Sequence, residues 1–111
     1  MSSHKIDRIS AEVSRAISEI LANEARDEIL KTITITAAEV TNDLSYAKIY
    51  FTSLSDEKKE RLEYELNEAK GFIRAELSKR VNLRHTPELK FIYDNSIEYG
   101  ENIERIIKNL D

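Results

Sequence analysis

The segment EAKGFIRAELSKRVNLRHTPELKFIYD, residues 68–94, determines how the rest of the chain is interpreted. Apolar residues recur at helical spacing in its first half and alternate with polar residues in its second half. Pro87, the only proline in the chain, stands between the two patterns and disfavours helical backbone angles at Thr86. The segment therefore predicts a helix to about residue 80, a loop over residues 82–87, and a strand that begins near residue 89.

The same segment concentrates positive charge in a chain that is acidic overall. The full chain carries 17 Lys and Arg against 21 Asp and Glu, for a net charge of −4. A local cationic patch is typical of contact with a polyanion, whereas the overall acidity argues against indiscriminate nucleic-acid binding. The basic residues of the segment are Lys70, Arg74, Lys79, Arg80, Arg84 and Lys90.

The length and composition limit the class of protein. With 111 residues the chain has room for one domain, expected to span residues 1–111, and for one hydrophobic core. The chain has no cysteine, which excludes disulfides, thiol catalysis and thiolate zinc sites and is typical of a reducing cytoplasm. No apolar run approaches the roughly 20 residues of a membrane span, and the N-terminus lacks a signal-peptide pattern. We therefore expect a cytoplasmic monomer without a membrane partner.

Two strands and a helix are predicted ahead of this segment. Residues 4–25 place an apolar residue at every third or fourth position, which predicts an amphipathic helix. Residues 32–40 and 46–51 alternate β-branched, aromatic or small apolar residues with polar ones, which is typical of strands. Asn42 and Asp43 favour a turn between them, so the two strands are expected to be antiparallel neighbours.

The remaining signals concern helix ends. Ser55 is the expected N-cap of the second helix, and Gly71 is the expected site of a kink that divides this helix in two. Residues 94–96 predict a turn and a cap, and residues 97–110 predict a final helix. The order helix–strand–strand–helix–helix–strand, plus the terminal helix, predicts an α+β fold. Its simplest packing is a three-stranded sheet with the helices on one face.

Three pieces of the sequence resemble those of a known protein family. They are VTNDLSYAKIY at residues 40–50, AKGFIR at residues 69–74, and LRHTPELKF at residues 83–91 running into YDNS at residues 93–96. The element order is that of a type II KH domain, and the pieces, in this order and at these separations, closely resemble bacterial ribosome-binding factor A. The resemblance covers essentially the whole chain.

The resemblance implies a non-enzymatic assembly factor that needs no cofactor. Members of the family bind the immature small ribosomal subunit, contact its ribosomal RNA, and assist late maturation, including processing of the 5′ end of that RNA. The family is also tied to growth in the cold. Typical KH domains clamp nucleic acid with a Gly-X-X-Gly loop. This chain has Ala69-Lys70-Gly71 at the equivalent junction, as the family does, which favours folded ribosomal RNA over a single strand.

The expected RNA contact follows from the basic patch and the helix junction. Lys70 and Arg74, four residues apart, are neighbours on a helix face, and a helix that begins near Gly71 directs backbone N–H groups at phosphate. We expect charge reversal at Arg74 and Arg80 to abolish binding without lowering thermal stability. The expected RNA-binding residues are Lys70, Gly71, Arg74, Lys79, Arg80 and Arg84.

Structural roles compete with this interpretation. Each cation, taken singly, is better explained as part of a solvated helix face, and Arg80 or Arg84 could pair with Glu76 or Glu88. Gly71 is equally well explained as a packing site between helices.

A second hypothesis for function is a protein–protein adaptor. Its acidic helix, residues 56–68, would dock on a ribosomal protein or an assembly GTPase. Metal binding is not expected, because His4 and His85 stand alone. Asp43 and Asp94 are interpreted as turn and capping residues, and Tyr46, Tyr50 and Tyr93 as packing residues of the sheet.

Overall fold

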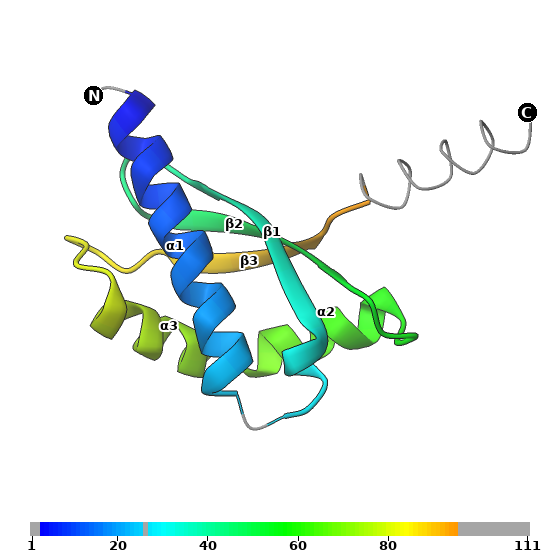
Figure 1. Ribbon diagram of the computed structural model, residues 1–111. Coiled ribbons are helices and arrows are strands. Elements are labelled where there is room, and N and C mark those ends of the chain that lie inside the picture. The colour runs from blue at the N-terminus through cyan, green and yellow to red at the C-terminus, as the bar shows by residue number, and fades with distance from the viewer. Residues whose placement is uncertain (1–2, 26, 96–111) are drawn as a thin grey trace, which may run out of the picture.

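The computed structural model describes residues 3–25 and 27–95, and these form the predicted α+β arrangement (Figure 1). The three strands make one sheet in the order β1-β2-β3, with β1 antiparallel and β3 parallel to β2. The helix predicted over residues 97–110 lies outside the described residues. The elements are α1 (Ser3–Asn23), the 3-10 helix η1 (Leu30–Thr32), β1 (Ile33–Val40), β2 (Tyr46–Ser53), α2 (Lys59–Glu68), α3 (Lys70–Arg80) and β3 (Glu88–Tyr93).

The hydrophobic core lies between the sheet and the helices. Every second residue is buried over much of β1 and β2, as the pleat of a strand requires when only one face is covered, and in β3 the buried residue is Leu89. Helix α1 packs mainly on β1, whereas α2 contacts β3 and α3 contacts both α1 and β3. The inward residues of the sheet are Ile33, Ile35, Val40, Ala47, Ile49, Phe51 and Leu89.

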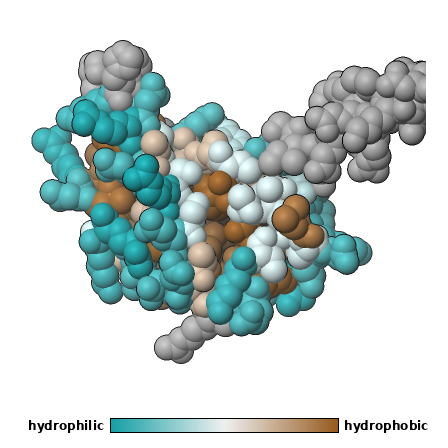
Figure 2. Space-filling view, viewed as in Figure 1, coloured by the Kyte–Doolittle hydropathy of each residue, from teal (hydrophilic) through white to brown (hydrophobic). Residues whose placement is uncertain are grey.

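Helix α1 forms where its apolar stripe predicts it. Val13, Ile17, Ile20 and Leu21 are each at most 1% exposed, so one side of the helix is fully covered. Its outer side carries charged residues, and Figure 2 shows many hydrophilic residues where α1 lies, beside a paler and more hydrophobic region across the middle of this face. Among the helices of the described part of the chain, none combines the length and apolar character that a membrane span requires.

A bulge in β1 changes which residues of that strand face the core. The pairing with β2 shifts between Ile35 and Ala37, which leaves Thr36 as the extra residue. Inward positions therefore move from odd numbers, at Ile35, to even numbers, at Val40. The Thr36 hydroxyl donates a hydrogen bond of 2.6 Å to Asp94, and the Val40 N–H donates one of 3.2 Å to the hydroxyl of Ser10 on α1.

The predicted N-cap at Ser55 is wrong. Helix α2 begins at Lys59, with Lys58 in the N-cap position and no hydrogen bond from a capping side chain. The Ser55 hydroxyl lies 2.9 Å from the hydroxyl of Ser53 and accepts a hydrogen bond of 3.4 Å from the N–H of Glu57. Ser55 therefore stabilises the turn that follows β2. Serine is favoured in such turns as well as at helix N-caps, so its presence here indicates the turn and not the start of α2.

The predicted division into two helices is confirmed, but the break lies at Ala69 instead of Gly71. Ala69 has φ −89° and ψ 0°, a region open to residues with a side chain, so no glycine is needed there. Gly71 lies inside the first turn of α3, and a Cβ built on it meets nothing within 4 Å. The packing role considered for Gly71 is therefore wrong, because no described neighbour requires the missing side chain.

We expect Leu77→Ala to lower the free energy of unfolding by about 2–5 kcal/mol, because Leu77 is fully buried and its truncation leaves a cavity. Leu54→Ala is the matched control, since Leu54 is 95% exposed, and its effect should stay within about 0.5 kcal/mol. Urea denaturation followed by circular dichroism measures both variants. Similar effects of the two substitutions would contradict the placement of Leu77 in the core.

Candidate nucleic-acid interface

The structure distributes the six predicted RNA-binding residues over two flanks of α3 and the loop after it. Arg74 and Arg80 are six positions apart, which at about 100° per residue places them roughly 120° apart around the helix. Arg74 reaches the loop before β3, and Arg80 reaches α1. The basic residues that are close together in sequence therefore do not form one continuous cationic surface.

Arg74 holds the loop between α3 and β3 in place. Its Nε donates a hydrogen bond of 2.9 Å to the carbonyl of Pro87, and its Nη2 donates one of 2.7 Å to the carbonyl of Thr86. Nη1 lies 3.6 Å from a carboxylate oxygen of Glu88. The planar guanidinium satisfies two backbone acceptors at once, which a lysine cannot do in the same geometry. About a third of the Arg74 side chain (36%) remains accessible to a ligand.

Arg80 joins α3 to the end of α1. Its Nη1 lies 3.8 Å from Glu19 and its Nη2 lies 3.3 Å from Glu24. Lys79, next to it, forms a 3.4 Å ion pair with Glu76 one turn earlier. Exposed pairs of this kind contribute about 0–1 kcal/mol, so a competing phosphate can displace them.

The ion pairs considered for Arg80 and Arg84 do not form among the described residues. Glu76 is paired with Lys79 and Glu88 with Arg74. Arg80 instead contacts Glu19 of α1 and Glu24 just after this helix, both far away in sequence. The prediction that some of these cations form ion pairs with acidic residues of the same chain is therefore confirmed, but the predicted partners of Arg80 and Arg84 are wrong. The structure also changes the expectation for charge reversal at Arg74 and Arg80, because both hold elements together and their reversal should lower stability.

Lys70, Gly71 and Arg84 remain available to a ligand. Gly71 and Arg84 are exposed, and Lys70 is half-buried at the start of α3. In the described part of the chain, neither Lys70 nor Arg84 has an ion-pair or hydrogen-bond partner for its side chain. These two cations are therefore the members of the predicted set that can bind phosphate without breaking an internal contact.

Arg84 lies on a cleft at one end of the molecule. The cleft has a volume of about 520 Å³ and is formed by the start of α1, the β1–β2 turn and the loop after α3. Lys5 and Arg84 supply positive charge, and Asn42 and Asn82 supply amide groups that bind phosphate or sugar oxygens. We call this the end cleft; it is lined by Lys5, Ile6, Ile9, Asn42, Asp43, Leu44, Asn82, Leu83 and Arg84.

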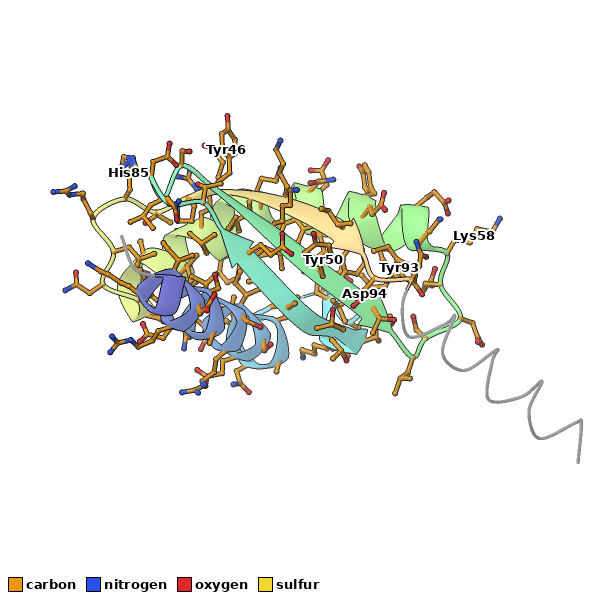
Figure 3. The ribbon with its side chains drawn as sticks, turned by 90° about the horizontal axis from the view of Figure 1, so that it is seen from above. Tyr46, Tyr50, Lys58, His85, Tyr93 and Asp94 are labelled. Carbon is orange, nitrogen blue, oxygen red and sulfur yellow. The ribbon has the colours of Figure 1, made fainter. Side chains whose placement is uncertain are left out.

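From the sequence alone, Asn42 is not predicted in this site, and Lys5 is only a secondary candidate for the basic surface because the acidic Asp7 and Glu12 are close to it. Asn42 comes about 40 residues before Arg84 and Lys5 about 80 residues before it, and only the folded chain brings the three together. The signal that could have pointed to Asn42 is its position in the VTNDLSYAKIY piece of the family resemblance. Figure 3 shows the loop residue His85 at this end of the molecule and Lys58 at the opposite end.

The β1–β2 turn at the end cleft is held by Asp43. Its carboxylate accepts hydrogen bonds from the Ser45 hydroxyl at 2.6 Å, the Ser45 N–H at 3.0 Å and the Thr41 hydroxyl at 2.8 Å. These bonds, that of the Ser45 hydroxyl first, lower the pKa of Asp43 from 3.8 to about 2. Leu44 takes φ 64° in the same turn. Asp43 therefore acts as the turn residue that the sequence predicts.

The tyrosines of the sheet have different environments. Tyr93 packs edge to face on Phe51, with ring centroids 5.6 Å apart. Tyr50 donates a hydrogen bond of 3.4 Å to Glu39. Tyr46 is 46% exposed, and the Nζ of Lys90 lies 5.0 Å from its ring centroid. Figure 3 shows Tyr46 projecting away from the ribbon.

Within residues 3–25 and 27–95, no group of three or more His, Asp or Glu side chains is placed to hold a metal ion.

Comparison with known proteins identifies the family of this chain. A family model described as Ribosome-binding factor A matches residues 5–107. A ribosome-binding factor A of Staphylococcus carnosus is 44% identical over 111 residues, which cover 99% of this chain and 96% of the relative. The chain belongs to the ribosome-binding factor A family. The resemblance seen in the sequence is thereby confirmed.

Solved structures of ribosome-binding factor A share the fold. The crystal structure of the Thermus thermophilus protein matches with a TM-score of 0.70 at 28% identity, over 79% of this chain and 94% of that one. A model of Thermus thermophilus ribosome-binding factor A, fitted into an electron-microscopy map of its complex with the 30S subunit, matches with a TM-score of 0.68 at 26% identity. That match covers 81% of this chain and 96% of the other.

In this member of the ribosome-binding factor A family, Arg74→Lys should lower the free energy of unfolding by about 1–3 kcal/mol, because the two backbone carbonyls lose a charged donor. Arg8→Lys is the control, since Arg8 is exposed and its side chain makes no hydrogen bond or ion pair with the described residues. Urea denaturation compares the two variants. Equal stability would show that the guanidinium of Arg74 does not hold the loop.

The hydrogen bonds to the Asp43 carboxylate make the stability of the protein depend on pH. A carboxylate whose pKa is lowered by folding stabilises the protein above its unfolded value, near 3.8, and this stability is lost as the pH falls through about 2. Asp43→Asn should therefore be less stable than the wild type at pH 7, and the difference should shrink below about pH 4. Asp56→Asn, an exposed control, should show no such difference. Urea denaturation from neutral pH down to about pH 2 tests this, and a pH-independent difference would contradict it.

Proposed function

We propose that this protein is a maturation factor of the small ribosomal subunit that acts by binding. In this proposal it binds the immature subunit and its ribosomal RNA without catalysing a reaction, and assists late assembly and 5′-end processing of that RNA, with a role in adaptation to cold. The single observation that carries the proposal is membership of the ribosome-binding factor A family over residues 5–107. The relative fitted into a 30S complex supports the small subunit as the partner.

The available cations support a contact that runs along one flank of α3 to the end cleft. Lys70 and Arg84 have no partner among the described residues, and Arg74 between them is still partly accessible. Gly71 lies beside Lys70 in the first turn of α3, where backbone N–H groups point toward an approaching phosphate. Lys5 extends the contact on the far side of the end cleft. Lys79 and Arg80 extend it only where RNA displaces their acidic partners.

The double variant Lys70→Glu/Arg84→Glu tests this surface. It should weaken binding to immature small subunits by at least about tenfold, the effect of about 1.4 kcal/mol. Its binding should also depend less steeply on salt concentration than that of the wild type, because fewer counterions are released from the RNA. Sedimentation of labelled protein with purified immature subunits, at several salt concentrations, measures both quantities.

The matched control is Lys58→Glu/Lys59→Glu. It changes the net charge by the same amount on exposed residues at the far end of α2 (Figure 3). We expect it to bind as the wild type does, apart from a small nonspecific loss. Equal loss in the two double variants would reject the proposed surface. Failure of the wild type to bind immature subunits would reject the proposed function itself.

A further inference from the structure

A second hollow lies at the bend between α2 and α3, on a different side from the proposed RNA contact. Figure 1 shows the end of α1, η1 and the α2–α3 junction close together, and these elements form a groove of about 410 Å³. Phe72 on its wall is two residues from both Lys70 and Arg74, about 200° around α3 and so on nearly the opposite side. We call this the bend groove; it is lined by Glu24, Ala25, Asp27, Leu30, Glu65, Glu68, Ala69 and Phe72.

The floor of the bend groove is apolar. Ala25 and Leu30 are buried, Ala69 is half-buried, and Phe72 leaves 43% of its surface exposed. A single exposed hydrophobic residue is ordinary on a protein surface. Phe72 differs from an isolated case because it stands beside a hollow whose base is already apolar, so a second apolar side chain could be buried against it.

The rim of the bend groove is acidic. All four charged residues described along it are carboxylates. Arg26, which stands between Ala25 and Asp27 in the sequence, lies outside the described residues. Glu24 and Glu65 are partly neutralised, by Arg80 at 3.3 Å and by Arg61 at 3.2 Å. Asp27 accepts a hydrogen bond of 3.0 Å from the N–H of Ile29, and none of the described cations is paired with it. Glu68, at the end of α2, likewise has no ion pair within the described part of the chain.

We propose that the bend groove binds a short basic segment of another protein that carries one large apolar side chain. The apolar side chain would pack on Phe72 and Leu30, and Lys or Arg residues beside it would pair with Glu68 and Asp27. Charge complementarity identifies this occupant, because carboxylates attract cationic side chains and repel the phosphates of RNA and of anionic lipids. The apolar floor also requires an apolar side chain to pack against it, which a simple cation does not have.

This inference does not depend on the proposed RNA contact. The two surfaces lie on different flanks of α3, and they select ligands of opposite charge. The geometry also allows both to be occupied at once, so the protein could hold RNA on one side and a basic protein segment on the other.

The experiment uses the full chain labelled with ¹⁵N and a synthetic peptide of Lys and Arg residues around one central Trp. Titration followed by NMR should shift the amide signals of Ala69, Phe72 and Leu30 most strongly. Two further peptides, one with Glu in place of every Lys and Arg and one with Ala in place of the Trp, should bind at least about tenfold more weakly.

Variants of the protein give the decisive comparison. Phe72→Ser and Glu68→Lys should each weaken peptide binding by about tenfold or more. Tyr64→Ser is the matched control for the first, because Tyr64 is an exposed aromatic residue of α2 outside the groove. Glu60→Lys is the control for the second, an exposed glutamate of α2 with the same change of charge. Both controls should bind the peptide as the wild type does.

Four outcomes would overturn the inference. Shifts that map away from the groove would show a different site, and equal losses in Glu68→Lys and Glu60→Lys would show unspecific attraction to an acidic protein. Tight binding of the Ala-substituted peptide would show that the apolar floor is not used. Tight binding of the Glu-substituted peptide would remove the argument from charge. Because Lys70→Glu/Arg84→Glu should leave peptide binding intact, the outcome is distinguishable from failure of the proposed RNA contact.

Discussion

The parallel pairing of β2 and β3 is the constraint on which the rest of the structure depends. A strand that runs parallel to its neighbour needs a crossover connection, and α2 and α3 supply it between Ser53 and Glu88. Both helices must bury an apolar side against the sheet, and the bend at Ala69 lets Leu66 and Ile73 both reach zero exposure. Helix α3 consequently meets the loop before β3 on one flank and α1 on the other.

The elements could be predicted because their signals are local. Helical and alternating periods reflect which side of each segment is buried, and α1 and the three strands follow those periods. The errors arose where a residue type has several uses. Ser55 organises a turn although serine also caps helices, and the bend uses Ala69 although Gly71 is close by. The bulge at Thr36 has no local signal, because it depends on pairing with β2.

The candidate site was only partly predictable, since proximity in sequence is a poor guide to which cations share a surface. The family and the positions of the cations follow from the residues alone. Their partners do not: Arg74 binds the carbonyl of Thr86, 12 residues away, and Arg80 binds Glu24, 56 residues away. Arg74 and Arg80, two of the six predicted RNA-binding residues, therefore stabilise the fold through these contacts. The contribution of Lys5 depends on how the start of α1 packs against the turn that Asp43 holds.

The bulge in β1 also limits how well another chain could pair with this border of the sheet. Strand β1 is at the border of the sheet, where unsatisfied backbone groups invite another chain to add itself as a further strand. The extra residue at Thr36 increases local twist, and the Ser10 hydroxyl occupies the N–H of Val40. The border of β1 is therefore neither flat nor regular, which makes it a poor template for pairing with a strand of another chain.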